Sequence, residues 1–358
     1  MTALAVVNQA VPTVAAMDWS QLGQLAGWSI LPLARLGALV AVGAILFRRG
    51  IITKATVDAL SRLTVALLLP SFMATSILTQ FRPGEPFYRG WYFLPLGAVA
   101  MIAGFAVLAW PIARFGRNWL APRYTIATLS FHNAGYLAIP IVTELYAHEP
   151  LARHQGPMLA LLFLFILGIS PLMWSVGVMA FGGSTDADGE PAWRKAISPP
   201  FVASVASVLA CLLHIPQQVS PQTLANVLSP FMMLGTCTVP LMMLILGATL
   251  MQLDHSYRPP VGLSVMALTL RLVLFPALIF GLLSLLLHWE VLDRSKAIIL
   301  FVESAMPTAV AMTVIAHRYA DERTAQAASG LIFLQYLFAA ATLPVWLTIW
   351  GWLYGYAV

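Results

Sequence analysis

The chain has 358 residues, of which 60% are hydrophobic and 9% are charged, with a mean hydropathy of +0.84. Soluble domains are about half apolar and about one-quarter charged, so this composition excludes a water-soluble globule and, because apolar residues abound, a disordered chain. The formal net charge is +5, but the basic residues are scattered along the chain, which indicates membrane topology rather than nucleic-acid binding. The composition predicts an all-α polytopic membrane protein.

Apolar runs bounded by charged and turn residues predict ten transmembrane helices, each near the ~20 residues that a bilayer requires. They cover residues 26–47, 60–79, 91–112, 122–147, 157–181, 198–215, 225–251, 260–287, 296–319 and 325–350. No cofactor and no metal site are expected, because neither Cys211 nor Cys237 has a second ligand at the spacing of a metal site.

The basic residues predict the orientation of these spans. Twelve of the 19 Lys and Arg residues lie near the connections after spans 1, 3, 5, 7 and 9, whereas five lie on the opposite side. Because basic residues accumulate in cytoplasmic connections, the odd connections are expected in the cytoplasm and both termini outside. The protein is thus expected to be a multi-pass protein of the cell membrane, that is, the cytoplasmic or inner membrane.

Prolines inside the spans form an internal repeat. One proline from each of the first five spans has a counterpart in the second five, 165 to 173 residues later. The pairs are Pro32 and Pro199, Pro70 and Pro240, Pro111 and Pro276, Pro140 and Pro307, and Pro171 and Pro344. Each half has an odd number of spans, so residues 1–182 and 198–358 are predicted to be two inverted five-helix repeats, joined by a cytoplasmic linker at 183–197.

Spans 4 and 9 are equivalent under this repeat and are predicted to be broken helices. Span 4 contains Asn133, Gly135 and Pro140 close together, and span 9 contains Glu303 and Pro307. Because proline favours the first position of a helix, half-helices are expected to begin at Pro140 and Pro307. Their N-termini would point two positive dipole ends into one cavity, which favours an anion. Simple proline kinks are the alternative.

Ionisable side chains inside a membrane are costly and are therefore candidates for function. Arg271 is interpreted as the counter-charge of a substrate carboxylate or of Glu303, with a structural ion pair as the alternative. Glu303 is interpreted as the coupling residue, which carries a proton or helps to bind sodium. Direct contact with substrate and structural pairing with Arg271 are its alternatives. His132 is interpreted as a packing residue, with a transport role as the alternative.

The remaining candidates lie in or near the two breaks. The Asn133 amide can donate to a carboxylate and accept from free backbone groups, Tyr136 offers a hydroxyl or an aromatic wall, and Thr308 adds a hydroxyl. The predicted substrate-binding residues are Asn133, Gly135, Tyr136, Pro140, Pro307, Thr308 and Arg271, and the predicted coupling residue is Glu303. No catalytic residue is assigned.

The stretch Asn133-Ala-Gly-Tyr-Leu-Ala-Ile-Pro140 resembles the Asn-x-Gly-Tyr-Leu-Gly-Ile-Pro signature of the auxin efflux carrier family. The segment Glu303-Ser-Ala-Met-Pro307 is similar to the second broken helix of that family, and Leu246-Gly-Ala-Thr-Leu250 is similar to its seventh span. Ala138 stands where the family usually has glycine. The short linker fits the bacterial branch, which includes malate and malonate permeases.

The resemblance implies a ten-helix fold like those of sodium/proton antiporters and bile-acid symporters, with crossed helices 4 and 9. Spans 1, 2, 6 and 7 would form a scaffold, with a possible homodimer through spans 2 and 7. Spans 3–5 and 8–10 would form a mobile domain that carries the substrate in an elevator-like cycle. The implied function is secondary active transport of small organic anions, such as malate, malonate or other carboxylates.

Four alternatives remain at this point. A proton- or sodium-coupled symporter of the bile-acid type is the first. An intramembrane enzyme is disfavoured because the short motif Gly168-Ile-Ser170 has no clearly partnered histidine and no aspartate lies inside a span. The third and fourth alternatives are a membrane sensor and a channel, each built on the same repeat. An ATP-driven pump is disfavoured by the lack of a Walker A pattern.

Overall fold

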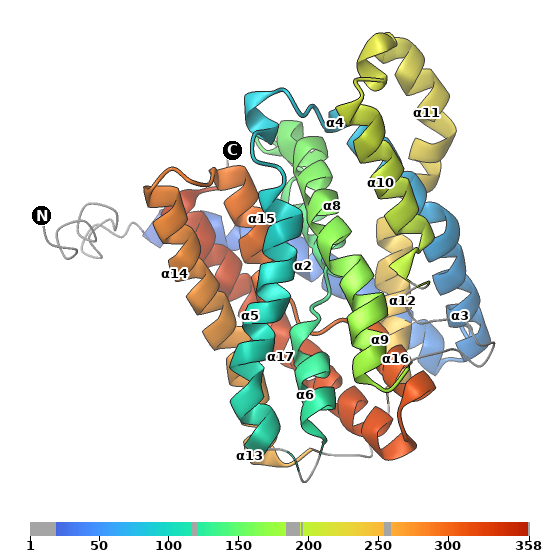
Figure 1. The fold of residues 1–358 in the computed structure, drawn as a ribbon, viewed down its shortest axis with the longest axis vertical. Coiled ribbons are helices and arrows are strands. Elements are labelled where there is room, and N and C mark those ends of the chain that lie inside the picture. Colours follow the sequence, from blue (N-terminus) through green and yellow to red (C-terminus); the bar gives the residue numbers. More distant parts are fainter. Residues whose placement is uncertain are drawn as a thin grey trace, which may run out of the picture.

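The computed structural model describes residues 19–115, 117, 120–183, 194, 196–253 and 259–356, which fold into a bundle of helices (Figure 1). The helices are α2 (Trp19–Arg48), α3 (Lys54–Leu63), α4 (Leu69–Gln80), α5 (Phe93–Phe115), α6 (Pro122–Ser130), α7 (Ala138–Leu145), α8 (Gln155–Leu172), α9 (Val178–Ala180), α10 (Pro199–Leu212), α11 (Pro221–Thr236), α12 (Thr238–Gln252), α13 (Val261–Thr269), α14 (Phe275–His288), α15 (Arg294–Ala305), α16 (Ala311–Tyr319) and α17 (Glu322–Tyr354).

Among the described residues, seven helical segments are long and apolar enough to cross a membrane. They are Gly27–Arg48, Lys54–Gln80, Pro86–Phe115, Ala152–Ala180, Pro221–Gln252, Val261–His288 and Glu322–Tyr354. α10 is a shorter apolar helix, and α6, α7, α15 and α16 are shorter than α10. The prediction of an all-helical polytopic membrane protein is confirmed, while the count of ten spans and the inverted repeat stay predictions.

Prolines inside the spans are accommodated in two ways. Helices α2, α5, α8 and α17 each contain a proline in their interior. Pro70 and Pro276 instead follow π-helical turns at Thr64–Leu68 and Leu270–Leu274. The wider turn gives room to the proline ring, which clashes in a regular α-helix with the carbonyl four residues earlier. The second of these turns carries Arg271.

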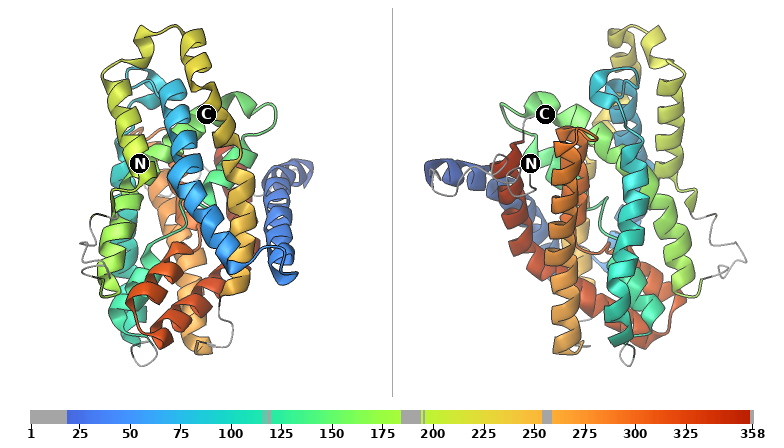
Figure 2. Two further views of the ribbon diagram at one scale, coloured as in Figure 1. Left: turned by 90° about the vertical axis from the view of Figure 1, so that its right-hand side faces the viewer. Right: turned by 60° about the vertical axis from the view of Figure 1, so that its left-hand side comes forward.

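Connections predicted to share one side of the membrane lie together at one end of the bundle (Figure 2). The α4–α5 and α14–α15 connections and Tyr354 line one hollow of about 840 Å³, and Lys296 Nζ donates to the Phe87 carbonyl over 3.0 Å there. At the other end, Tyr124 at the start of α6 stacks on Phe181 after α9, with ring centroids 5.2 Å apart. The predicted place of the N-terminus falls on residues 1–18, outside the described residues.

α2 and α12 pack closely because each helix presents a glycine to the backbone of the other. Gly43 lies against Leu244, and Gly247 lies against the carbonyl of Val40, so that a Cβ at either glycine would overlap backbone atoms. Small residues let two helices approach in this way within a membrane. This pair forms one side of the bundle, next to α7 and α17.

Spans 4 and 9 are interrupted as expected and are not kinked. Residues 131–137 separate α6 from α7, and residues 306–310 separate α15 from α16. The expectation that half-helices begin at Pro140 and Pro307 is wrong, since α7 begins at Ala138 and α16 begins at Ala311. Proline lacks a donor only at its own position and restricts the residue before it, so it can lie in a first turn or before a helix.

The predicted division of the chain is only partly within the structure. Of the predicted linker at 183–197, residues 184–193 and 195 lie outside the described residues. The boundaries 1–182 and 198–358 therefore stay predictions.

Candidate functional site at the paired helix breaks

The two breaks cross and pair with each other through backbone hydrogen bonds. His132 and Thr308 form an isolated antiparallel bridge, the one extended pairing in the described part of the chain. Asn133 N donates to the Pro307 carbonyl over 2.9 Å, and Ala309 N donates to the Phe131 carbonyl over 2.8 Å. Unpaired backbone groups are costly inside a bilayer, and the bridge satisfies them where the helices end. Residues far apart in sequence are thereby held at one point.

Asn133 is the centre of the first break. Its Oδ1 accepts from Tyr136 N over 2.9 Å, and its Nδ2 donates to the Tyr336 hydroxyl of α17. With its backbone bond to Pro307, the residue joins three segments of the chain. The prediction placed Asn133 at a substrate; the structure shows that it also shapes the break itself.

Thr308 and Gln335 hold the second break. Gln335 Oε1 accepts from Thr308 N over 2.9 Å and from Thr308 Oγ1 over 2.8 Å, and Oγ1 also lies 2.6 Å from the Thr128 carbonyl. Because the Thr308 N–H can only donate, the acceptor must be the amide oxygen, which leaves Gln335 Nε2 on the other side. That nitrogen is buried and has no hydrogen-bond partner among the described residues.

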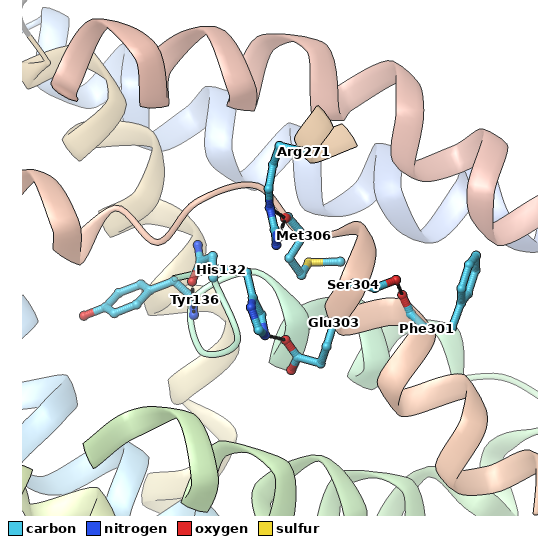
Figure 3. A network of polar contacts seen from close by, with 8 residues as sticks. His132, Tyr136, Arg271, Phe301, Glu303, Ser304 and Met306 are labelled. Carbon is cyan, nitrogen blue, oxygen red and sulfur yellow. Dashed lines mark hydrogen bonds and ion pairs between the residues drawn. The ribbon is translucent and has the colours of Figure 1, made fainter. Parts of the chain in front are cut away.

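Arg271 is fully buried and turned toward the end of α15 (Figure 3). Its Nε and Nη2 donate to the Met306 carbonyl over 2.9 and 2.5 Å, and its guanidinium lies 4.7 Å from the ring centre of Phe105 and 5.5 Å from that of Phe275. Its Nη1 has no hydrogen-bond partner within the described ranges. Among the described residues, no hydrogen bond or ion pair joins Arg271 directly to Glu303, because its fork binds a helix-end carbonyl; its charge still acts on Glu303 through space, and its role as a counter-charge stays a prediction.

Glu303 lies against His132 (Figure 3). His132 Nε2 and Glu303 Oε2 are 3.2 Å apart, and the two side chains are 1% and 0% exposed. The contact has ion-pair distance without the alignment of a hydrogen bond, since neither carboxylate oxygen has a hydrogen-bonding partner in the part of the chain that is described. On its other side, the His132 ring lies 5.6 Å from that of Phe165 in α8.

The other predicted residues lie around this crossing. Gly135 and Tyr136 belong to the partly exposed end of the first break, next to the buried Asn133. Pro140 is buried as the third residue of α7, and Pro307 is buried within the second break. The structure therefore brings Asn133, Pro307, Thr308, Arg271 and Glu303 together and leaves Pro140 in the helix beyond.

Sequence reasoning did not include three residues that organise the crossing. His132 was interpreted as a packing residue, and Gln335 and Tyr336 were not singled out at all. Two signals were present: His132 is adjacent to Asn133, and Gln335 is an uncharged polar residue within the apolar tenth span. Their buried side chains form a site that combines two unpartnered donors, Arg271 Nη1 and Gln335 Nε2, with an acid and a base in contact.

The comparisons with known proteins point to membrane transport. Residues 189–347 match the family described as Membrane transport protein. The match includes the second break with Arg271 and Gln335 but not the first break. Over 318 residues the chain is 24% identical to a protein of Methanothermobacter thermautotrophicus described as an uncharacterized transporter. The alignment covers 86% of this chain and 94% of that relative.

Proposed function

Because the chain belongs to the auxin efflux carrier family of membrane transport proteins, we propose that it is a secondary transporter of small organic anions, such as malate or malonate. The observation that carries the anionic substrate is Arg271, a fully buried cation with one free guanidinium nitrogen beside the paired breaks. A buried guanidinium nitrogen without a hydrogen-bond partner is costly, so such a group is retained where a ligand completes its bonding.

A carboxylate matches the unpartnered donors of the site. It carries only acceptors, and it forms its strongest hydrogen bonds with guanidinium and amide N–H groups. Arg271 binds Met306 and Gln335 binds Thr308, so both side chains are held against the same short stretch of backbone, residues 306–308. We assign the carboxylate to these donors and to Asn133, Tyr136 and Thr308 at the breaks. No enzymatic reaction is assigned.

The membrane arrangement that supports this function has ten spans. We propose that α6 with α7 and α15 with α16 are two broken spans, which join the seven long segments and α10 as inverted repeats. In the elevator-like cycle, the helices that carry the crossing move against α2, α4 and α10–α12. Arg35 Nη1 in α2 lies 3.7 Å from Glu144 Oε2 in α7, which gives such an interface a polar contact that can break and re-form.

Counterflow in proteoliposomes tests the proposal. Vesicles loaded with unlabelled malonate or malate are expected to take up the labelled compound with saturation. Asn133→Ala removes two side-chain hydrogen bonds of the first break and is expected to lower transport efficiency at least about tenfold, which corresponds to about 1.4 kcal/mol. Asn226→Ala on the exposed face of α11 is the matched control and should transport like the unmodified protein. The absence of saturable counterflow with every carboxylate tested contradicts the proposal.

A further inference from the structure

We propose that His132 and Glu303 form one proton-binding pair, which takes up a proton for each negative charge of the substrate, to a limit of two. This inference rests on the proposed function and deepens it, because it assigns the coupling ion and its stoichiometry. His132 and Glu303 share the coupling, whereas the sequence predicts Glu303 alone as the coupling residue.

The pair has the geometry that proton exchange between an acid and a base requires. The imidazole nitrogen and the carboxylate oxygen are 3.2 Å apart, and both side chains are buried to 1% exposure or less. His132 belongs to the first break and Glu303 to the last turn of α15, just before the second. A movement that separates the two breaks therefore also separates the acid from the base.

The balance of charge connects the pair to the substrate. In the empty site, the positive charge of Arg271 offsets the negative charge of Glu303 while His132 is neutral. A dicarboxylate adds two negative charges to a site that is closed off from water, where uncompensated charge is very costly. One proton on His132 and one on Glu303 restore a net charge of zero. Both protons come from the water on the side where the substrate enters, and both leave with it.

Three ionisable groups determine this charge balance, namely Arg271, His132 and Glu303. Arg271, from the turn between α13 and α14, is the charged group that acts electrostatically on both His132 and Glu303. α17 contributes the neutral Tyr336, bonded to Asn133, and α8 contributes the apolar ring of Phe165. The total charge of the loaded site is therefore set by Arg271, the pair and the substrate.

The chemistry of the pair favours a proton over sodium. Hard cations bind oxygen ligands, whereas an imidazole nitrogen is a good proton acceptor near neutral pH. Here the carboxylate faces such a nitrogen. In the described residues, no group of three or more His, Cys, Asp or Glu side chains is arranged to hold a metal ion.

The test measures how far the protein accumulates labelled malonate or malate at equilibrium, with the membrane potential clamped at zero. With the interior one pH unit more alkaline, coupling to two protons gives about 100-fold accumulation and coupling to one gives about 10-fold. We expect about 100-fold for the unmodified protein, about 10-fold for His132→Gln and for Glu303→Gln, and none for the double variant. Counterflow needs no gradient and is measured for all four beside the melting temperature in detergent, which shows whether each is folded. It should be slower in the two variants that lack His132, because their loaded sites keep one uncompensated negative charge.

Matched controls are His288→Gln and Glu322→Gln, which change an exposed histidine and an exposed glutamate at helix ends. Both should accumulate malonate as the unmodified protein does.

Counterflow with accumulation that ignores the pH gradient, or that follows a sodium gradient, overturns the proton pair but not the transporter. Single variants that still reach about 100-fold also overturn it. If neither dicarboxylate shows counterflow, the proposed dicarboxylate transport fails, and the coupling falls with it. Should the variants not fold, the proton-to-malonate ratio of the unmodified protein, measured with a pH dye inside the vesicles, decides alone.

Discussion

The two helix breaks differ in what holds them, although the spacing of the prolines predicts that they are equivalent. In the first break, Asn133 bonds to its own segment through Tyr136 N, and residues 135–137 are partly exposed. In the second, residues 306–310 are all buried, and its bonds come from Arg271 and Gln335 on other helices. The side-chain bonds of the first break come partly from within it and partly from Tyr336 of α17, whereas those of the second come from other parts of the chain.

This difference indicates a division of labour. A buried segment tied to two other helices is a rigid frame, whereas a partly exposed loop bonded to itself can change shape without breaking the core. We infer that the second break provides the fixed reference of the site and that the first break adapts to the substrate. Changes at the second break should therefore cost more stability than changes at the first.

The largest effect is expected at Arg271. Arg271→Met keeps the length of the side chain but removes the donors to the Met306 carbonyl and the positive charge near Glu303. Removing one partner of a buried charged arrangement costs about 3–5 kcal/mol, so the purified protein in detergent should show a strongly reduced melting temperature.

Arg271→Lys is the informative companion variant. It keeps the charge but lacks the planar fork that binds one carbonyl through two nitrogens, so its melting temperature should lie between those of Arg271→Met and the unmodified protein. If Arg271→Met melts like the unmodified protein, the second break is not held from outside and the comparison fails.

A smaller effect is expected from two neighbours on α17, each of which serves a different break. Gln335→Leu leaves the buried Thr308 N–H without its acceptor, which costs about 1–3 kcal/mol. Tyr336→Phe removes only the hydroxyl that accepts from Asn133 Nδ2. The adjoining residues 135–137 are partly exposed, so water can replace this hydroxyl, and the expected cost is about 0.5–1.5 kcal/mol. Thermal unfolding of the two variants side by side tests the order. Equal losses, or a larger loss for Tyr336→Phe, would contradict it.

Much of this fold can be predicted from the sequence, because a bilayer imposes strict rules. Long apolar runs identify the spanning helices, and Asn133, Gly135 and Pro307 mark the two interruptions, because such residues are unfavourable in uninterrupted helices. The prediction of the helix starts was wrong, since proline restricts where a helix can continue without specifying where it begins.

The partners within the site could not be predicted in the same way. Arg271 and Glu303 are the obvious opposite charges, but the sequence says nothing of whether their side chains meet across two helices. Arg271 instead binds the Met306 carbonyl, and Glu303 meets His132. The role of Gln335 depends on where α17 crosses Thr308, 27 residues earlier in the chain. Such pairings follow from packing in three dimensions, which periodicity and composition do not encode.

The smallest effects are expected at the two prolines, and the effect should differ between the two breaks. Pro140 is the third residue of α7, where a missing N–H costs nothing, so Pro140→Ala should change stability by less than about 0.5 kcal/mol. Pro307 keeps Met306 extended (φ −66°, ψ 142°), which ends α15 and presents the Met306 carbonyl to Arg271. Pro307→Ala gives Met306 back its helical conformation and should cost about 1 kcal/mol, with a matching fall in melting temperature. The sequence predicts that the two prolines are equivalent, so an equal response would mean that the second break does not depend on its proline more than the first.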